Sequence, residues 1–151
     1  MLMPSGGQAD ILLKKLAGNS VSTSGKDNVI GGVGLTPEES SAFQELITGL
    51  NLSRSVILKA TVFCLDKSMS SLAIAQKISA SITEAQTGLT TQQLVARMYL
   101  LNDVLYNAHC TRPGASQYRR QFQEMLPDVI ERLREVCDGI SSIAAIALRE
   151  R

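Results

Sequence analysis

Hydrophobic residues recur every three or four positions along most of the chain from Leu35 onwards, which is the spacing of one buried face on an α-helix. The first such stretch follows Thr36 and Pro37, and a glutamate stands three residues after the threonine. A threonine cap, a proline in the first turn and a glutamate at the third helical position are typical of a helix start. The pattern therefore predicts a first helix that begins at Thr36 and ends near Gly49.

The same periodicity predicts three more helices in the middle of the chain. The second is expected from about Ser53 to Lys67 and the third from about Ser70 to Thr83. A second capping box, Thr90 to Gln93, predicts the start of a fourth helix. The expected core face of this fourth helix consists of Leu94, Val95, Met98, Leu101, Leu105 and Ala108.

After Pro113-Gly114, a fifth helix is expected from about Ala115 to Val136. Pro127 should kink or split it, because proline lacks a backbone donor and clashes with the preceding turn. Asp138-Gly139 should end it, and a further helix should run from Ser141 to Arg151. Six or seven helices joined by short turns predict an all-α bundle or short solenoid, with at least one more packing helix beyond the last residue.

The first 34 residues differ in composition from the rest of the chain. They hold seven of the eleven glycines, together with many serines and asparagines. Such composition cannot bury enough apolar surface to fold alone, although residues 9–16 could form a short amphipathic turn. We therefore expect a flexible leader over residues 1–34 and one helical domain over residues 35–151.

Composition narrows the class of protein. With 151 residues, 44% of them hydrophobic, the chain can fill one core, and 4% aromatic residues with no tryptophan favour helix over sheet. Fifteen basic against fourteen acidic residues leave no overall field that would attract nucleic acid or an anionic membrane. The three cysteines lack the spacing of a zinc site, and no apolar run is long enough to span a bilayer. We expect a soluble intracellular protein without a metal or another cofactor.

No catalytic constellation is visible in the sequence. There is one histidine, and the chain lacks a nucleophile elbow, a P-loop, a dinucleotide fingerprint and a paired-carboxylate pattern. We therefore expect a protein that is not an enzyme.

The expected fourth helix carries a polar and aromatic stripe beside its apolar face, formed by Tyr99, Asn102, Asp103, Tyr106 and Asn107. The Asp103 carboxylate stands among leucines and valine, so it is either a partly buried acceptor for a neighbouring helix or one presented to a ligand. For the two tyrosines, the edge of the core is favoured over a ligand platform.

Positive charge is concentrated after the fourth helix. The residues between Ala108 and Phe122 include no acid and carry a local charge of +3, from Arg112, Arg119 and Arg120. These guanidinium groups either face solvent or hold phosphate, and no stacking motif beside them supports RNA binding. Arg54 is another cation, placed in the turn before a helix start, where backbone donors favour anions.

The run from Val95 to Asn107 resembles the helix-four signature of the CID family, the domains that interact with the C-terminal repeat domain of RNA polymerase II. The likeness is greatest to the version found in U2 snRNP-associated splicing factors with a SURP motif, because residues 60–65 and 115–122 fit as well. The resemblance covers about residues 35–151. It implies a right-handed superhelix of seven to eight helices, similar to ENTH and VHS domains and truncated here at the C-terminal end.

The resemblance also implies a groove that holds a phosphorylated heptad peptide in a β-turn. Asp103 would bind the turn, with the motif asparagines Asn102 and Asn107 and the phenols of Tyr99 and Tyr106 beside it. Phosphate would be held near Ser53 and Arg54, which match a turn close to a phosphoserine in some members. Further candidate phosphate ligands are Arg112 and a family arginine placed at Arg149 or Arg151.

The implied role is a nuclear one in pre-mRNA splicing. The expected partners are the phosphorylated polymerase tail and spliceosomal proteins, with RNA contacted through other domains and no membrane. One alternative is a spliceosomal scaffold that does not bind the tail. Another is a trafficking adaptor of the ENTH/VHS type, for which Lys14 and Lys15 would have to contribute to a lipid-binding patch.

Overall fold

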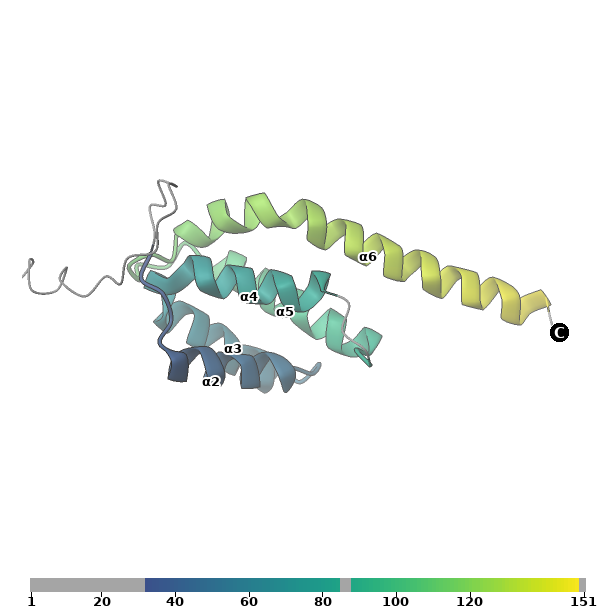
Figure 1. Cartoon of the computed structure of the whole chain (residues 1–151), viewed down its shortest axis with the longest axis horizontal. Coiled ribbons are helices and arrows are strands. Elements are labelled where there is room, and N and C mark those ends of the chain that lie inside the picture. The colour runs from purple at the N-terminus through teal and green to yellow at the C-terminus, as the bar shows by residue number, and fades with distance from the viewer. Residues whose placement is uncertain (1–31, 85–87, 150–151) are drawn as a thin grey trace, which may run out of the picture. The chain divides into compact units, whose positions relative to one another are not determined.

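The computed structural model describes residues 32–84 and 88–149, which fold into five α-helices and one short 3-10 helix, with no strand among them (Figure 1). The all-α prediction is therefore confirmed for these residues. The expected turn at residues 9–16, and Arg151, lie outside them. The elements are α2 (Pro37–Thr48), α3 (Arg54–Asp66), η1 (Ser68–Ser70), α4 (Ser71–Thr83), α5 (Thr91–Asn107) and α6 (Gln117–Arg149).

Both predicted capping boxes are present. The Thr36 hydroxyl accepts a hydrogen bond from the Glu39 N–H at 3.2 Å, and the Glu39 carboxylate accepts one from the Thr36 N–H at 3.1 Å. At α5, Thr90 and Gln93 form the same reciprocal pair at 3.2 and 3.0 Å. Each box satisfies backbone donors that a helix start leaves unpaired, so α2 and α5 begin where the sequence places them.

The core lies between four packed helices and the first half of α6. α4 packs against α2, α5 and α6, while α3 packs against α2 and α5. Because α4 touches so many neighbours, seven of its thirteen residues are buried. The largest fully buried side chains of the core include Phe43, Ile74, Ile78, Ile82, Leu100, Tyr118 and Phe122.

The core face of α5 is rotated from the predicted one. Leu94 and Leu101 are buried as expected, but Val95 is exposed, and the centre of the buried face is formed by Leu100 and Val104. Apolar residues occur on several sides of this helix, so periodicity alone did not define the face. Its contacts with α3 on one side and α4 on the other decide it.

A charged residue, Arg97, is buried within α5. Its guanidinium donates a hydrogen bond to the carbonyl oxygen of Ser81, in the last turn of α4, and burial lowers the pKa of the side chain. A cation placed against the carbonyl end of a helix is favoured by the helix dipole. Arg97 therefore joins α5 to the end of α4.

The α6 helix runs without interruption through Pro127 and Gly139, so the predicted split, the predicted stop and the separate last helix are wrong. Pro127 and Gln123, whose carbonyl loses its helical partner, are both exposed, and water can replace that hydrogen bond. Gly139 does not adopt the left-handed conformation that ends many helices. A glycine inside a helix costs only about 1 kcal/mol relative to alanine.

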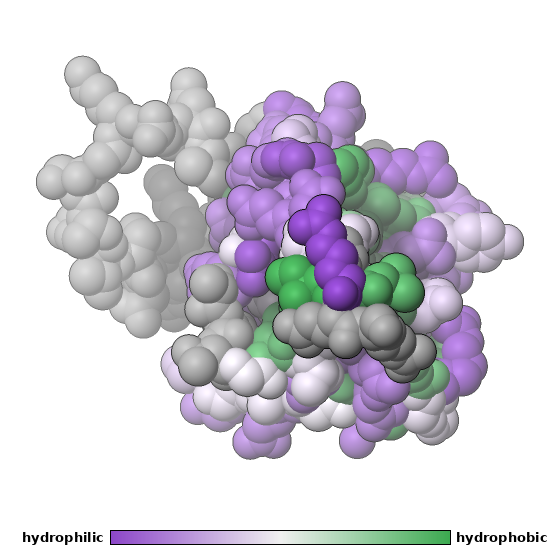
Figure 2. Space-filling model, turned by 90° about the vertical axis from the view of Figure 1, so that its right-hand side faces the viewer, coloured by the Kyte–Doolittle hydropathy of each residue, from purple (hydrophilic) through white to green (hydrophobic). Residues whose placement is uncertain are grey.

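Only the first half of α6 is covered by other helices (Figure 1). Tyr118, Phe122 and Val129 are buried. Ile140, Ile143 and Leu148 are exposed, and Figure 2 shows hydrophobic side chains at the surface around the end of this helix. None of the helices in the described ranges combines the length and hydropathy that crossing a bilayer requires.

The predicted break at Pro113-Gly114 is also present, and it fixes the loop between α5 and α6. The Ser68 hydroxyl of η1 donates a hydrogen bond to the Pro113 carbonyl at 2.7 Å. Gly114 has a φ of 82°, and a Cβ at this position would lie 2.5 Å from the Ser68 carbonyl oxygen. Only glycine combines this backbone angle with so close an approach.

Candidate functional site

Two of the residues singled out in the sequence meet across α3 and α5. Arg54, the first residue of α3, forms an ion pair with the Asp103 carboxylate in the middle of α5. The Asp103 side chain is only 13% exposed, whereas that of Arg54 is 68% exposed. Asp103 therefore binds a residue of the neighbouring helix α3 through one oxygen, Oδ2. Its carboxylate is mostly covered, whereas the Arg54 guanidinium bonded to it is mostly exposed.

The rest of the α5 stripe surrounds this ion pair unevenly. Asn102 is exposed, while the Asn107 amide donates a hydrogen bond to the backbone carbonyl of Asp103 at 2.8 Å. Tyr99 and Tyr106 are 52% and 74% exposed, so their expected place at the edge of the core is wrong. Leucine, alanine and valine side chains already fill the core side of α5, and the rings are left on the surface.

A hollow of about 380 Å³ adjoins the first half of the stripe. Its lining consists of Val95, Met98, Tyr99 and Asn102. Val95 was predicted to face the core but is exposed, and it gives the polar stripe an apolar border. Such a mixture of apolar and amide groups suits an extended peptide segment.

An exposed apolar pair on α3 was not predicted from the sequence. Leu58 and Val62 are about half exposed, and they follow Arg54 at steps of four residues, which places all three on one side of the helix. Asp66 comes four residues later and pairs with Arg112 in the loop after α5. The signal was available in the sequence, because α3 has apolar residues on more sides than one buried face requires.

The other residues predicted to bind phosphate lie in different parts of the fold. The Ser53 hydroxyl lies 3.0 Å from the Ser55 hydroxyl beside the first turn of α3. Arg112 reaches Asp66 rather than Asp103, and Arg149 is exposed at the far end of α6. The structure therefore brings Arg54 to Asp103, with Ser53 next to Arg54 in the chain, and it does not bring Arg112 or Arg149 into the same ion pair.

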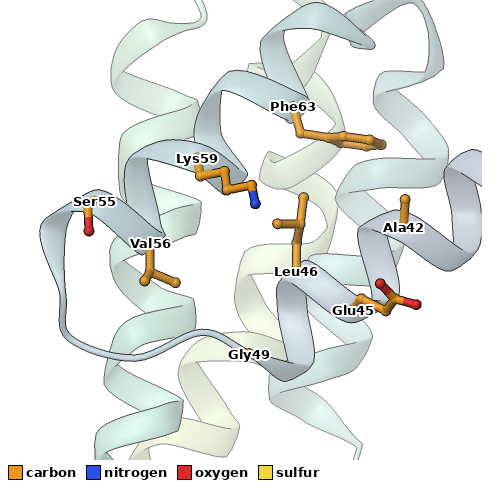
Figure 3. A pocket seen from close by; sticks show the side chains of 8 residues that line it. All are labelled: Ala42, Glu45, Leu46, Gly49, Ser55, Val56, Lys59 and Phe63. Carbon is orange, nitrogen blue, oxygen red and sulfur yellow. The ribbon is translucent and has the colours of Figure 1, made fainter.

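A larger hollow, of about 730 Å³, lies between α2 and α3 (Figure 3). Phe63 and Leu46 point into it, and the Lys59 side chain extends across it. Lys59 and Phe63 lie on a different side of α3 from Arg54, because helical positions five or nine residues apart point in different directions. This hollow is separate from the α5 stripe.

The chemistry of the site depends on the polar and apolar groups that the described residues present. They contain no group of three or more histidine, cysteine or acidic side chains placed to hold a metal ion. Burial raises the pKa of the Cys64 thiol far above its usual range, so this cysteine stays protonated and unreactive. What the site offers is a carboxylate that accepts hydrogen bonds, a cation that donates them, and apolar surface around both.

A protein family and two curated relatives match most of this chain. The CID domain family matches residues 41–144. Two curated relatives from Arabidopsis thaliana, "Protein RRC1-like" and "Protein RRC1", are 32% and 33% identical over 118 residues. The matched region is 78% of this chain and 12% of the length of each relative. No solved structure matches the chain. The chain belongs to the CID domain family.

Proposed function

We propose that this domain is a non-enzymatic module that binds the phosphorylated heptad-repeat tail of RNA polymerase II. We also propose that it is part of a nuclear splicing factor of the U2 snRNP-associated, SURP-containing type, and that it couples transcription to pre-mRNA processing. Membership of the CID domain family supports a protein-interaction role. The observation that carries the proposal is the Asp103 carboxylate, which lies partly accessible between an exposed guanidinium and exposed phenol rings.

Each part of the site has a partner in such a peptide. The Asp103 carboxylate accepts hydrogen bonds from donors of a β-turn, and the exposed amide of Asn102 can pair with peptide backbone. Tyr99, Tyr106 and the Leu58–Val62 pair provide apolar contact for the peptide's side chains. A helix with only a structural role has no need of these exposed apolar side chains.

Phosphate recognition is assigned first to Arg54. Its guanidinium is exposed, it stands at the first residue of a helix, and the Ser53 hydroxyl is beside it. A guanidinium and a helix N-terminus both favour an anion. Arg112, Arg149 and Arg151 are proposed as further phosphate contacts along a longer peptide, and Arg112 would have to exchange Asp66 for phosphate.

The test is a titration of labelled tail peptides, unmodified and phosphorylated at either heptad serine, into the wild type and Asp103→Ala. We expect the variant to lose about 1 to 3 kcal/mol of binding free energy, the cost of removing a partly buried charged acceptor. Asp138→Ala, on the exposed part of α6, is the control and should bind as the wild type does. Equal and negligible binding by the wild type and Asp103→Ala would reject the peptide site.

The ion pair to Arg54 supports a second candidate, a scaffold in which Asp103 only holds α3 against α5. Thermal melting separates the two functions. If Asp103→Ala melts several degrees lower and no peptide binds, the carboxylate is structural. Unchanged melting together with lost peptide binding supports recognition.

A further inference from the structure

We propose that Arg54 makes the site selective by occupying Asp103 in the free protein, so that a ligand binds well only when it brings both an anion and a hydrogen-bond donor. This inference rests on the proposed peptide-binding function. It assigns Arg54 an inhibitory role toward unmodified peptides in addition to its attraction for phosphate. An arginine that only contacted phosphate would attract phosphorylated peptides without inhibiting the binding of unmodified ones.

The geometry of the pair is the first support. Arg54 bonds to the Asp103 oxygen Oδ2, and the carboxylate is mostly covered while the guanidinium is mostly open. A ligand donor that reaches Oδ2 therefore competes with Arg54 for that oxygen. An anion, by contrast, reaches the open side of the guanidinium directly.

Charge is the second support. Among the described residues, Arg54 is the one ionic partner of Asp103, and the Asn107 amide is already bonded to the backbone carbonyl of Asp103. A ligand that offers only a donor would separate Arg54 from its counter-charge. A ligand that offers only phosphate would draw Arg54 away and leave the carboxylate unpaired beside an added negative charge. A ligand with both groups leaves neither charge unpaired.

The structure provides a matched comparison in a second ion pair, which joins α3 to the loop after α5. Arg112 and Asp66 are 54% and 46% exposed, so both members are open to solvent. Neither shields the other from a ligand. Loss of Arg112 should therefore lack the inhibitory component that we assign to Arg54.

The experiment measures the affinities of an unmodified and a singly phosphorylated tail peptide for the wild type, Arg54→Gln, Arg54→Lys and Arg112→Gln. An exposed ion pair contributes up to about 1 kcal/mol, so Arg54→Gln should bind the unmodified peptide about two- to fivefold more tightly than the wild type. The same variant should bind the phosphorylated peptide more weakly. Arg54→Lys should keep most of the preference for phosphate, and Arg112→Gln should not tighten binding of the unmodified peptide.

The test is whether Arg54→Gln raises or lowers the affinity for the unmodified peptide. If Arg54→Gln weakens the binding of both peptides, or affects only the phosphorylated one, Arg54 is an ordinary contact and the inference is overturned. Circular dichroism of each variant should match the wild type, since Arg54 is exposed. Should Arg54→Gln prove unfolded, a phosphate titration of the wild type and Asp103→Asn decides the same question.

A titration with inorganic phosphate separates this inference from the proposed function. The NMR signal of the Arg54 guanidinium is followed in the wild type and in Asp103→Asn, which removes the competing charge. We expect phosphate to bind Arg54 about two- to fivefold more tightly in Asp103→Asn. Equal affinity, or no response of Arg54 in either protein, overturns the inference. If no peptide binds any protein, the proposed function fails, while this titration still decides whether Asp103 competes for Arg54.

Discussion

The Tyr118 hydroxyl donates a hydrogen bond to the carbonyl oxygen of Cys64 at 2.6 Å, and this bond joins the first turn of α6 to the last turn of α3. The carbonyls in the last turn of a helix have no partner within the helix, so Tyr118 supplies one from outside. Burial raises the pKa of Tyr118 far above its usual range, and the hydroxyl therefore remains a donor in neutral solution.

Replacement of Tyr118 by phenylalanine should destabilise the domain. The ring is fully buried, and Tyr118→Phe leaves the Cys64 carbonyl without this partner at an expected cost of about 1 to 3 kcal/mol. Urea denaturation monitored by circular dichroism measures the effect. Tyr106→Phe removes a hydroxyl from an exposed ring and is the control, with an expected change within about 0.5 kcal/mol. Equal stability of the two variants would contradict the assigned bond.

Two glycines, Gly114 before α6 and Gly139 inside it, should respond to alanine in opposite directions. Gly114→Ala places a methyl group against the Ser68 carbonyl at a positive φ, so we expect a clear decrease in the free energy of unfolding. Gly139→Ala meets no atom within 4 Å inside a continuous helix, and it should increase helicity. Amide hydrogen exchange over residues 136–146 should slow in Gly139→Ala. Faster exchange there would show that the helix ends near Gly139.

The two halves of α6 should differ in sensitivity to truncation of their side chains. Phe122→Ala should cost about 3 to 5 kcal/mol, because the ring is fully buried. Ile143→Ala, on the exposed half, should change the free energy of unfolding by less than about 0.5 kcal/mol. Chemical denaturation of the two variants provides the comparison. A large loss for Ile143→Ala would mean that the second half of the helix is covered in solution.

The capping box of α2 should make stability depend on pH. The Lys67 ammonium, 2.5 Å from Glu39, and the Thr36 N–H both lower the pKa of the Glu39 carboxyl below its ordinary 4.5. The ionised Glu39 carboxylate therefore stabilises the folded state above pH 4.5. This stabilisation is lost as the pH falls through the lowered pKa of the group.

Comparison of the wild type with Glu39→Gln isolates this contribution, since glutamine can retain the box without the charge. The difference in unfolding free energy between the two proteins should be present at pH 7 and should shrink in acid. Glu38→Gln, next to it and without an ion pair in the structure, is the control. A difference that stays constant from pH 7 to strongly acidic solution would count against the Glu39–Lys67 pair.

Most of the fold could be read from local signals in the sequence. The boundaries of α2 and α5 followed from side chains that bond to their own backbone within three residues. The continuity of α6 could not be predicted in this way. Whether Pro127 breaks a helix depends on whether the carbonyl it leaves unpaired faces water, and this depends on what the helix packs against.

The site was predictable only in part for a similar reason. The stripe on α5 identified Asp103, and the turn before α3 identified Arg54, but their contact joins positions far apart in the chain. Leu58 and Val62 were missed because the surplus of apolar residues on α3 does not show which of them another helix covers. Tyr99 and Tyr106 were misplaced for the same reason.

The charges at the two ends of α3 oppose its own electric field. Arg54 stands at the positive, amino-terminal end and Asp66 at the negative, carboxyl-terminal end, which is the reverse of the arrangement that stabilises an isolated helix. Among the residues that the structure describes, each is neutralised by one counterpart, Arg54 by Asp103 and Asp66 by Arg112, in the observed alignment of α3. A shift of α3 by one turn would restore the unfavourable end charges. The two ion pairs therefore favour the native registration of α3 over one that is shifted by a turn.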